Sequence, residues 1–357
     1  MQSVELLSSN RVSKPIILHI GDPIKYNFEE YQRFSTQFNV IRPTVQDRQR
    51  PAFISALKEK RWGDFSAIYR PFWNTGGEMG NWDDELIQLL PNSVQIFASA
   101  GAGYDWVNTE LLAERGILYC NGASASSEAV ADMAIFHIIA AFRNLAWSQL
   151  AARSLDPVRW VDAHENVAAT AFNPRGQTLG IIGMGNIGYM IAVKAYTAFG
   201  MNIAYYDIYR KSGPQERAVE AKYYSNMDAL LAVSDCILTA TPFAGQVLIT
   251  KERLAKFKDG ARFINIARGS LVDEEALVEA LASGKLKAAG LDVFANEPHV
   301  HPGLVKMENV TLTCHNAGAS LDTHIGFEKL AMENIQGYLL EGKTKTAVNS
   351  HLIPSKI

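Results

Sequence analysis

The spacing of three glycines constrains this chain more than any other feature of its sequence. Gly183, Gly185 and Gly188 form a G-x-G-x-x-G pattern between the apolar run TLGII (178–182) and a helical pattern that ends at Gly200. Asp207 stands 19 residues after Gly188, at the end of the next apolar run. In a strand–turn–helix unit such glycines let the backbone approach a pyrophosphate, and an acidic residue about 20 residues further on binds a ribose. The pattern predicts a dinucleotide-binding domain.

The carboxylate of Asp207 favours NAD, because it accepts hydrogen bonds from the ribose hydroxyls and repels a 2′-phosphate. Arg210 and Lys211 follow closely and would favour NADP if they faced the ribose. If they are solvated loop charges, NAD is the cofactor, and this is the interpretation we adopt. Asn186 and Ile187, at the start of the helix, are expected to lie at the pyrophosphate.

The rest of the chain shows the alternation of strands and helices typical of parallel α/β folds. Six apolar runs between residues 178 and 313 each lead into a turn or helix, as a doubly wound Rossmann-type domain requires. Earlier in the chain we expect strands at 15–20, 67–69 and 95–98 and a helix at 29–38. A long apolar helix at 126–143 is expected to be buried and to lie in a dimer interface. Residues 150–176, with weak periodicity, are interpreted as a connecting segment, and 323–340 as a final helix.

Composition excludes several classes of protein. A length of 357 residues indicates two domains, and a net charge of −3 argues against a nucleic-acid or membrane surface. Three separated cysteines form neither a disulfide set nor a CxxC metal pair, so we expect no metal and a cytoplasmic location. The most apolar run, 134–142, is too short to span a bilayer. The ending Ser355-Lys356-Ile357 resembles a peroxisomal S-K-L address, although three ordinary tail residues are the simpler interpretation.

Four motifs in order carry a resemblance to a known family. GMGNIG (183–188) is followed by NIARGSLVDEEAL (265–277), GLDVFANEP (290–298) and TCHNAGAS (313–320). Together, over about residues 98–340, the chain resembles the D-2-hydroxyacid dehydrogenase family. This implies NAD-dependent interconversion of (R)-2-hydroxy acids and 2-oxo acids by a homodimer. It also implies a flavodoxin-like substrate domain (1–123 and 319–357) into which the Rossmann-type NAD domain (124–318) is inserted.

The resemblance assigns the catalytic roles that the chemistry requires. Arg268 matches the cation that holds the substrate carboxylate, which a planar guanidinium does well. His315 matches the acid/base, and Glu297 matches the carboxylate that orients the histidine ring. Each residue alone has a structural explanation, and only the joint pattern favours catalysis. The sequence differs from the usual family pattern at the two positions next to His315. The family usually has proline where Cys314 stands and an apolar residue where Asn316 stands.

Several other residues each match a single position of the family. Ala102 and Gly103 match the loop whose N–H groups receive the substrate carboxylate. The remaining matches to cofactor-lining positions are Thr241, Pro242, Ile266, Ala267, Asp292, Asn316 and Ala317.

The loop after the strand at 67–69 carries two aromatic residues, Phe72 and Trp73. Loops in this position line the cleft of a parallel α/β domain, so the two rings predict an aromatic wall and a bulky or aromatic substrate such as mandelate. The alternative is that both rings pack inward and support the loop. The alternatives are a glyoxylate/hydroxypyruvate reductase or an NAD-sensing co-repressor, which keeps the same Arg, Glu and His. Formate dehydrogenase, with glutamine in place of Glu297, ranks lower.

Overall fold

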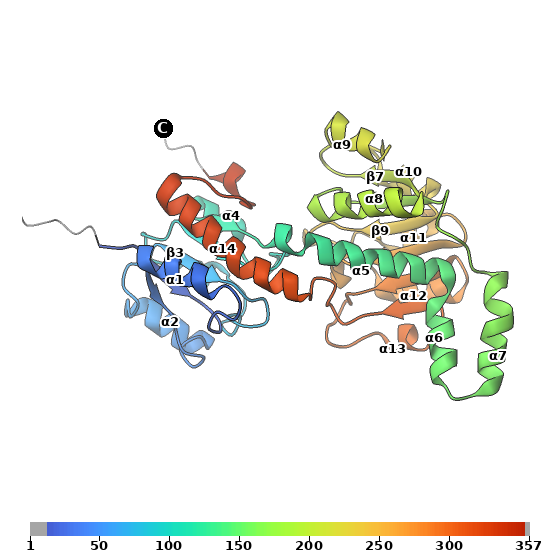
Figure 1. Cartoon of the computed structure of the whole chain (residues 1–357), viewed down its shortest axis with the longest axis horizontal. Helices are drawn as coiled ribbons and strands as arrows, with labels where there is room; N and C mark the ends of the chain where they lie inside the picture. The colour runs from blue at the N-terminus through green and yellow to red at the C-terminus, as the bar shows by residue number, and fades with distance from the viewer. Residues whose placement is uncertain (1–12, 354–357) are drawn as a thin grey trace, which may run out of the picture. The chain divides into compact units, whose positions relative to one another are not determined.

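The computed structural model describes residues 13–353, which divide into two compact units. The split unit contains residues 13–122 and 324–353, and the inserted unit contains Ala123–Thr323. Figure 1 follows both along the chain. The sequence Ser355-Lys356-Ile357 lies outside the described residues.

The split unit is built on a five-stranded parallel sheet in the order β2-β1-β3-β4-β5. This is the flavodoxin-like order that the sequence analysis anticipated. Its strands are β1 (Ile16–His19), β2 (Asn39–Ile41), β3 (Ala67–Arg70), β4 (Ile96–Ser99) and β5 (Leu118–Cys120). We did not predict β2 and β5, because a three-residue strand shows no readable alternation.

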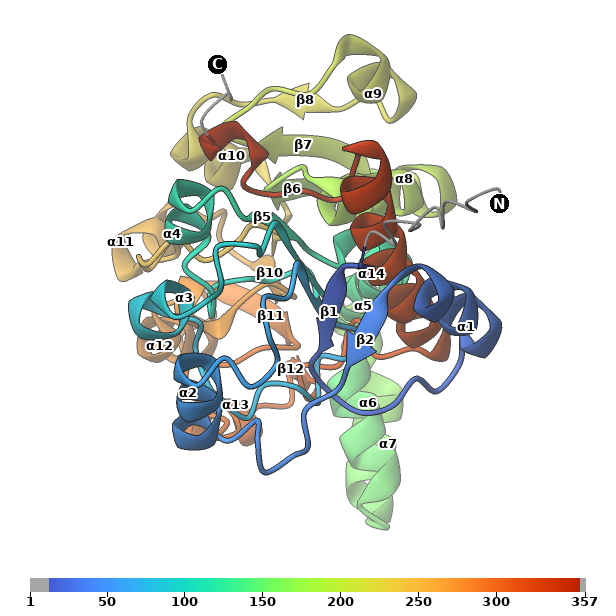
Figure 2. The ribbon, with the colours of Figure 1, turned by 90° about the vertical axis from the view of Figure 1, so that its left-hand side faces the viewer.

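Alternating side chains of these strands supply two separate cores. Ile17 packs with α1 (Phe28–Gln37) and α14 (Leu321–Glu341), whereas Leu18 packs with α2 (Arg50–Lys58) and α3 (Asp84–Gln88). Figure 2 shows α1 and α14 on one side of the sheet and α2, α3 and α4 (Thr109–Glu114) on the other. The short η3 (Ser350–Leu352) closes the described chain.

The inserted unit has a seven-stranded parallel sheet in the order β12-β11-β10-β9-β6-β7-β8. The order reverses between β6 and β9, which makes this a doubly wound sheet of the Rossmann type, as predicted. The two-residue β8 was not predicted. The strands are β6 (Thr178–Ile182), β7 (Asn202–Tyr206), β8 (Lys222–Tyr223), β9 (Cys236–Thr239), β10 (Ala261–Asn265), β11 (Leu286–Leu291) and β12 (Val310–Leu312).

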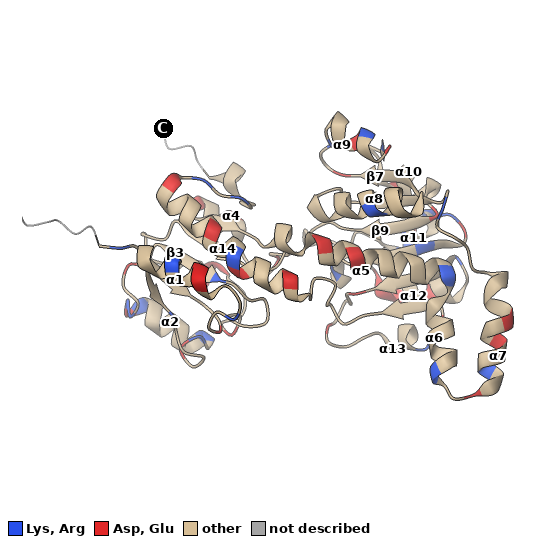
Figure 3. Cartoon of the chain, in the orientation of Figure 1, with Lys and Arg blue, Asp and Glu red and all other residues tan. Residues whose placement is uncertain are grey.

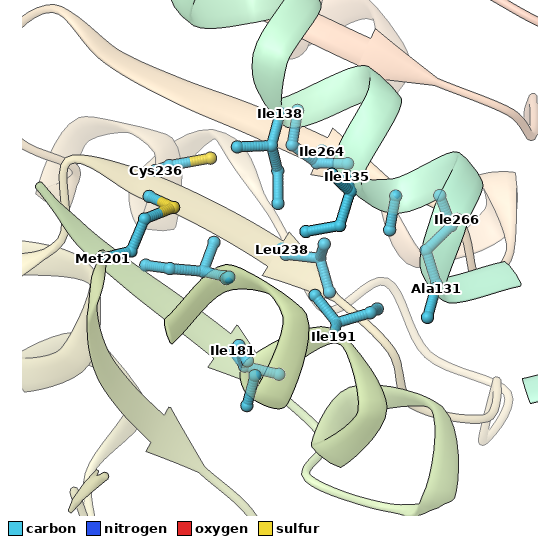
Figure 4. Close-up of a cluster of buried hydrophobic side chains, with 14 of the residues drawn as sticks. Ala131, Ile135, Ile138, Ile181, Ile191, Met201, Cys236, Leu238, Ile264 and Ile266 are labelled. Carbon is cyan, nitrogen blue, oxygen red and sulfur yellow. The ribbon is translucent and has the colours of Figure 1, made fainter. Parts of the chain in front are cut away.

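Helices cover both faces of this sheet. On one face α5 (Ala123–Arg143) and α8 (Asn186–Phe199) enclose the core drawn in Figure 4, where Ile135 and Ile191 meet Leu238 of β9. The other face is covered by α10 (Met227–Val233), α11 (Lys251–Lys256) and α12 (Glu274–Ala282). The remaining short elements are α9 (Gly213–Ala218), η2 (Gly269–Leu271) and α13 (Pro302–Val305).

Helix α5 is long and apolar enough to cross a membrane by length and composition alone. However, 56% of that apolar window is buried inside the protein, against α8 and the sheet. Its apolar residues on several faces are therefore explained by packing within its own unit. They give no separate indication of a subunit interface.

The interpretation of 150–176 as a connecting segment was wrong. The chain there forms α6 (Leu145–Arg153), α7 (Pro157–Asn166) and η1 (Val167–Ala169). Pro157 begins α7 rather than breaking it, because the first turn needs no N–H from that residue, and Asp156 caps it by accepting a 2.9 Å bond from the Val158 N–H. The weak periodicity reflects a helical hairpin that projects from the unit in Figure 1 and carries charges of both signs in Figure 3.

Candidate active site

The first and third glycines of the motif are required by the fold, whereas the second leaves space. A Cβ on Gly183 (φ +94°) would lie 2.7 Å from the Ala240 carbonyl oxygen, and one on Gly188 only 2.1 Å from the Gly183 oxygen. A Cβ on Gly185 would meet nothing within 4 Å. The N-terminus of α8 therefore adjoins open space at Gly185 and presents a positive dipole end, which fits a pyrophosphate.

Asp207 lies at the end of β7 and faces this turn. Its carboxylate accepts a 2.8 Å hydrogen bond from the Met184 N–H, and the Lys211 ammonium lies 3.4 Å away. Arg210 is held elsewhere, because it donates two 2.9 Å bonds to Glu216. These bonds, together with one from the Tyr205 hydroxyl, lower the pKa of Glu216 to about 2. The charge of Arg210 is therefore neutralised within the protein.

The turn that carries Arg268 is held by a buried amide. Asn265, 1% exposed at the end of β10, accepts a 3.1 Å bond from the Ala267 N–H and donates a 2.8 Å bond to the Arg268 carbonyl. The Thr239 hydroxyl donates 2.8 Å to the same amide oxygen. We did not single out Asn265, although a polar residue at the end of a buried strand was a signal that could have found it.

Gly269 allows the Arg268 turn to lie directly against the Glu297 loop. A Cβ at this position would stand 1.8 Å from the carbonyl carbon of Phe294. The N–H of Phe294 in turn donates a 3.0 Å bond to Oε1 of Glu297. The two loops thus meet backbone to backbone, and only glycine permits that approach.

Glu297 and His315 form the predicted pair. Nδ1 of His315 lies 2.7 Å from Oε2 of Glu297, and because a carboxylate only accepts, Nδ1 donates. This leaves Nε2 of the ring available. The two side chains remain 43% and 34% exposed, so the pair is accessible.

Asp292 holds the loop that presents His315. Its side chain is buried and accepts bonds from the Thr313 hydroxyl (2.6 Å), the Asn316 N–H (3.0 Å) and the Ala317 N–H (2.9 Å). Its carbonyl oxygen accepts a 2.7 Å bond from the His315 N–H. Between these anchors His315 takes a left-handed backbone conformation (φ +49°), which is strained for a residue with a side chain.

A histidine to which the sequence analysis gave no role extends this network. Nε2 of His137, on α5, lies 3.0 Å from the Thr313 hydroxyl, which itself donates to Asp292; Nε2 therefore donates. Burial lowers the pKa of His137 to about 4, so the ring is neutral near pH 7. A Cβ on Gly290 would stand 2.6 Å from the His137 Cβ. The glycine of GLDVF therefore makes room for this ring.

The expected site residues of the inserted unit follow the carboxyl ends of its parallel strands, which meet at one edge of the sheet. In chain order they come after β6 (Gly183, Gly185, Asn186, Ile187 and Gly188), β7 (Asp207), β9 (Thr241 and Pro242), β10 (Ile266, Ala267 and Arg268), β11 (Asp292 and Glu297) and β12 (His315, Asn316 and Ala317).

The expected substrate residues of the split unit follow β3 and β4. Trp73 is 44% exposed, but Phe72 is 1% exposed and packs within the unit, so the structure does not support an aromatic wall made by both rings. The N–H groups of Ala102 and Gly103 donate no hydrogen bond to any described residue. The loop that carries them is held by Asn121, whose amide donates 2.9 Å to the Ala102 carbonyl.

Comparisons with known proteins show the family to which the chain belongs. The NAD-binding domain of the D-isomer specific 2-hydroxyacid dehydrogenase family matches residues 135–317. The chain is 37% identical over 337 residues to 4-methyl-2-oxopentanoate reductase A of Aspergillus oryzae, covering 94% of this chain and 98% of that protein. It is 34% identical over 273 residues to glyoxylate reductase 1 of Saccharomyces cerevisiae, covering 75% and 76% of the two chains.

A solved structure extends the similarity to the whole fold. The holo form of Rhodotorula graminis D-mandelate dehydrogenase superposes with a TM-score of 0.90 at 37% identity, covering 95% of this chain and 98% of that one. The chain belongs to the D-isomer specific 2-hydroxyacid dehydrogenase family. It is a 2-hydroxyacid dehydrogenase or reductase with an NAD-binding domain, and its substrates are small 2-hydroxy or 2-oxo acids.

The contact at Gly269 leads to a first prediction. Gly269→Ala should push the Arg268 turn from the Glu297 loop and reduce kcat/KM by about 10²-fold, the scale of a 1 Å misplacement. NADH affinity, measured by fluorescence titration, should change little.

Gly213→Ala is the matched control, because a Cβ there meets within 3 Å only the flexible end of the Arg217 side chain. Wild-type turnover by the Gly269→Ala variant would show that the loop contact does not position the site.

Proposed function

We propose that the protein transfers a hydride between NAD and an (R)-2-hydroxy acid/2-oxo acid pair with a bulky or aromatic side chain, of which mandelate is the example. The exposed Trp73 ring and the similarity to D-mandelate dehydrogenase support this choice. The alternative is a glyoxylate/hydroxypyruvate reductase, since glyoxylate reductase 1 of yeast is also similar. Trp73 is the observation that favours the larger side chain.

The hydrogen-bonded pair carries the proposed mechanism. Nε2 of His315 would take the hydroxyl proton during oxidation and return it during reduction. Glu297, bonded to Nδ1 at 2.7 Å, would keep Nε2 unprotonated for this purpose and stabilise the imidazolium that forms. Arg268 would hold the carboxylate and polarise the reacting oxygen.

The substrate carboxylate would also bind the unpaired N–H groups of Ala102 and Gly103. Bound NAD supplies the hydride acceptor. The open space at Gly185 would take its pyrophosphate, and Asp207 would take the adenosine ribose.

The acid/base role of His315 gives the second prediction. His315→Ala should lower kcat by ~10²–10⁴-fold and leave NADH affinity nearly intact, because the ring serves proton transfer rather than cofactor binding. Steady-state kinetics and NADH fluorescence measure the two effects.

His351→Ala is the matched control, since this exposed ring lies in η3 of the split unit and has no role in the proposed mechanism. Turnover within a few-fold of wild type in His315→Ala would remove His315 from the mechanism.

Cofactor choice gives the third prediction. Asp207→Ser should weaken NAD binding, and adding Glu216→Gln should release Arg210 for a 2′-phosphate. The double variant should therefore raise kcat/KM for NADPH by about tenfold over Asp207→Ser alone, the scale of a charge-assisted hydrogen bond.

Glu252→Gln removes one negative charge from the first turn of α11 and serves as the control for net charge. A wild-type protein that already prefers NADPH would contradict the role given to Asp207.

Substrate size gives the fourth prediction. In the wild-type protein kcat/KM for (R)-mandelate and (R)-phenyllactate should exceed that for (R)-lactate and (R)-glycerate. Trp73→Ala should reduce the aromatic values by about fivefold, because ring stacking is worth ~0.5–1.5 kcal/mol.

Phe28→Ala, which removes an exposed aromatic ring from α1 of the same unit, is the control. A wild-type preference for glyoxylate or glycerate would favour the alternative function, and an aromatic preference unchanged by Trp73→Ala would place the specificity elsewhere.

We also propose that the protein is a homodimer joined through the α6–α7 hairpin. Five large apolar side chains of this hairpin are exposed in the single chain: Leu150, Leu155, Val158, Trp160 and Val161. Such a patch on a projecting element is typical of a protein interface.

The fifth prediction follows from this patch. Sedimentation at micromolar concentration should give a dimer, and Val158→Asp with Trp160→Asp should give a monomer that still binds NADH. A wild-type monomer would contradict the proposal.

A further inference from the structure

A cavity lies in the inserted unit, at the edge of the sheet opposite to the candidate active site. Its volume is about 470 Å³, within the range of small-molecule sites. Its walls come from residues just before or at the start of β6, β9, β10 and β11, and from the chain after η1. All the strands are parallel, so this is the amino-terminal edge, whereas the residues of the candidate active site follow the carboxyl ends.

The wall of this cavity contains an arginine that the rest of the fold leaves incompletely bonded. Arg262 is 6% exposed, and its guanidinium carbon lies 4.1 Å from the ring centre of Phe142 and 5.3 Å from that of Phe172. Its Nε is buried and has no hydrogen-bond partner among the described residues. The rings contact the faces of the guanidinium, but its edge carries the N–H groups and still needs an acceptor.

No described carboxylate forms an ion pair with this arginine within 4 Å. Asp235 also lines the cavity, but its two oxygens are taken by the Lys258 ammonium and the Thr178 N–H. Asp259 is paired with Lys285.

Lys287 lines the cavity too, without an ion pair in the described part of the chain. Arg262 and Lys287 therefore leave two positive charges uncompensated at one cavity, and buried cations are normally paired.

We propose that this cavity binds a small organic oxyanion, a carboxylate or phosphate, on the edge of Arg262. A guanidinium edge offers parallel N–H donors that match the oxygens of either group, and Lys287 adds a second charge. The Phe172 ring, 54% exposed, provides an apolar wall for the substituent of the anion. This site is separate from the one that performs the dehydrogenase reaction.

The test is calorimetric titration of inorganic phosphate and, separately, benzoate into the NADH-saturated protein. NADH occupies the N-terminus of α8, so phosphate binding there does not contribute. Benzoate bound by the substrate site would be insensitive to Arg262.

Arg262→Met keeps an unbranched stem between the two rings and should weaken binding of the anion by about tenfold to a hundredfold, the range of a charge-assisted hydrogen bond. Lys287→Met should weaken it several-fold. Lys251→Met removes the same charge from a residue that is paired with Glu279, and neither of these two residues lines the cavity, so binding should be unchanged.

Binding of both anions that is weakened by Arg262→Met supports an oxyanion site, and such Arg262-dependent binding of benzoate alone supports a carboxylate site with an apolar requirement. Absence of binding by both, or equal affinity in wild type and Arg262→Met, would overturn the proposal. If Arg262→Met does not fold, equal affinity of Lys287→Met and Lys251→Met overturns it. Dehydrogenase activity is measured separately, so neither result bears on the proposed function.

Discussion

The hydrogen bonds of one buried carboxylate, that of Asp292, hold the candidate active site in its shape. Its two oxygens receive one hydroxyl and two backbone N–H groups, and its own carbonyl receives the N–H of His315. An ionised carboxylate taken out of water is costly unless such donors surround it. Since three of the donors come from the chain around His315, the stability of the buried charge and the position of the ring depend on each other.

This dependence reaches into the core of the inserted unit. The Thr313 hydroxyl donates a hydrogen bond to Asp292 and accepts one from His137. His137 belongs to α5, the long helix that covers the sheet. Its burial keeps the ring neutral, so the network adds no second charge to the interior. The position of the exposed His315 ring therefore depends on the packing of α5 against Gly290. The hydrogen bonds of His137, Thr313 and Asp292 connect the two.

The two edges of the same sheet have different electrostatic characters. At the carboxyl edge, positive groups face carboxylates or backbone oxygens: Lys211 lies by Asp207, and the Arg268 guanidinium donates a hydrogen bond to the Ala267 carbonyl. At the amino edge, Arg262 is stacked between rings and lacks an acid partner among the described residues. A parallel sheet keeps these regions apart by the length of its strands, which allows one domain to carry two anion-binding environments.

Much of the fold and of the site could be predicted from the sequence, because those features depend on local spacing. The glycine motif, Asp207 and the apolar runs predicted the doubly wound sheet, and the order of four motifs predicted the family. The short strands β2, β5 and β8 and the helices α6 and α7 could not be predicted, since neither their length nor their weak periodicity distinguishes them from loops.

Only the tertiary structure showed that Glu297 bonds His315, that Gly269 lets two loops touch, and that Phe72 is buried while Trp73 is not. It also showed that Glu216 neutralises Arg210 and that His137 contacts Thr313 in the loop that carries His315. The physical reason is the same in each case. A residue type and its spacing determine which bonds a side chain is able to make, but its actual partners lie elsewhere in the sequence and meet it only when the strands are assembled.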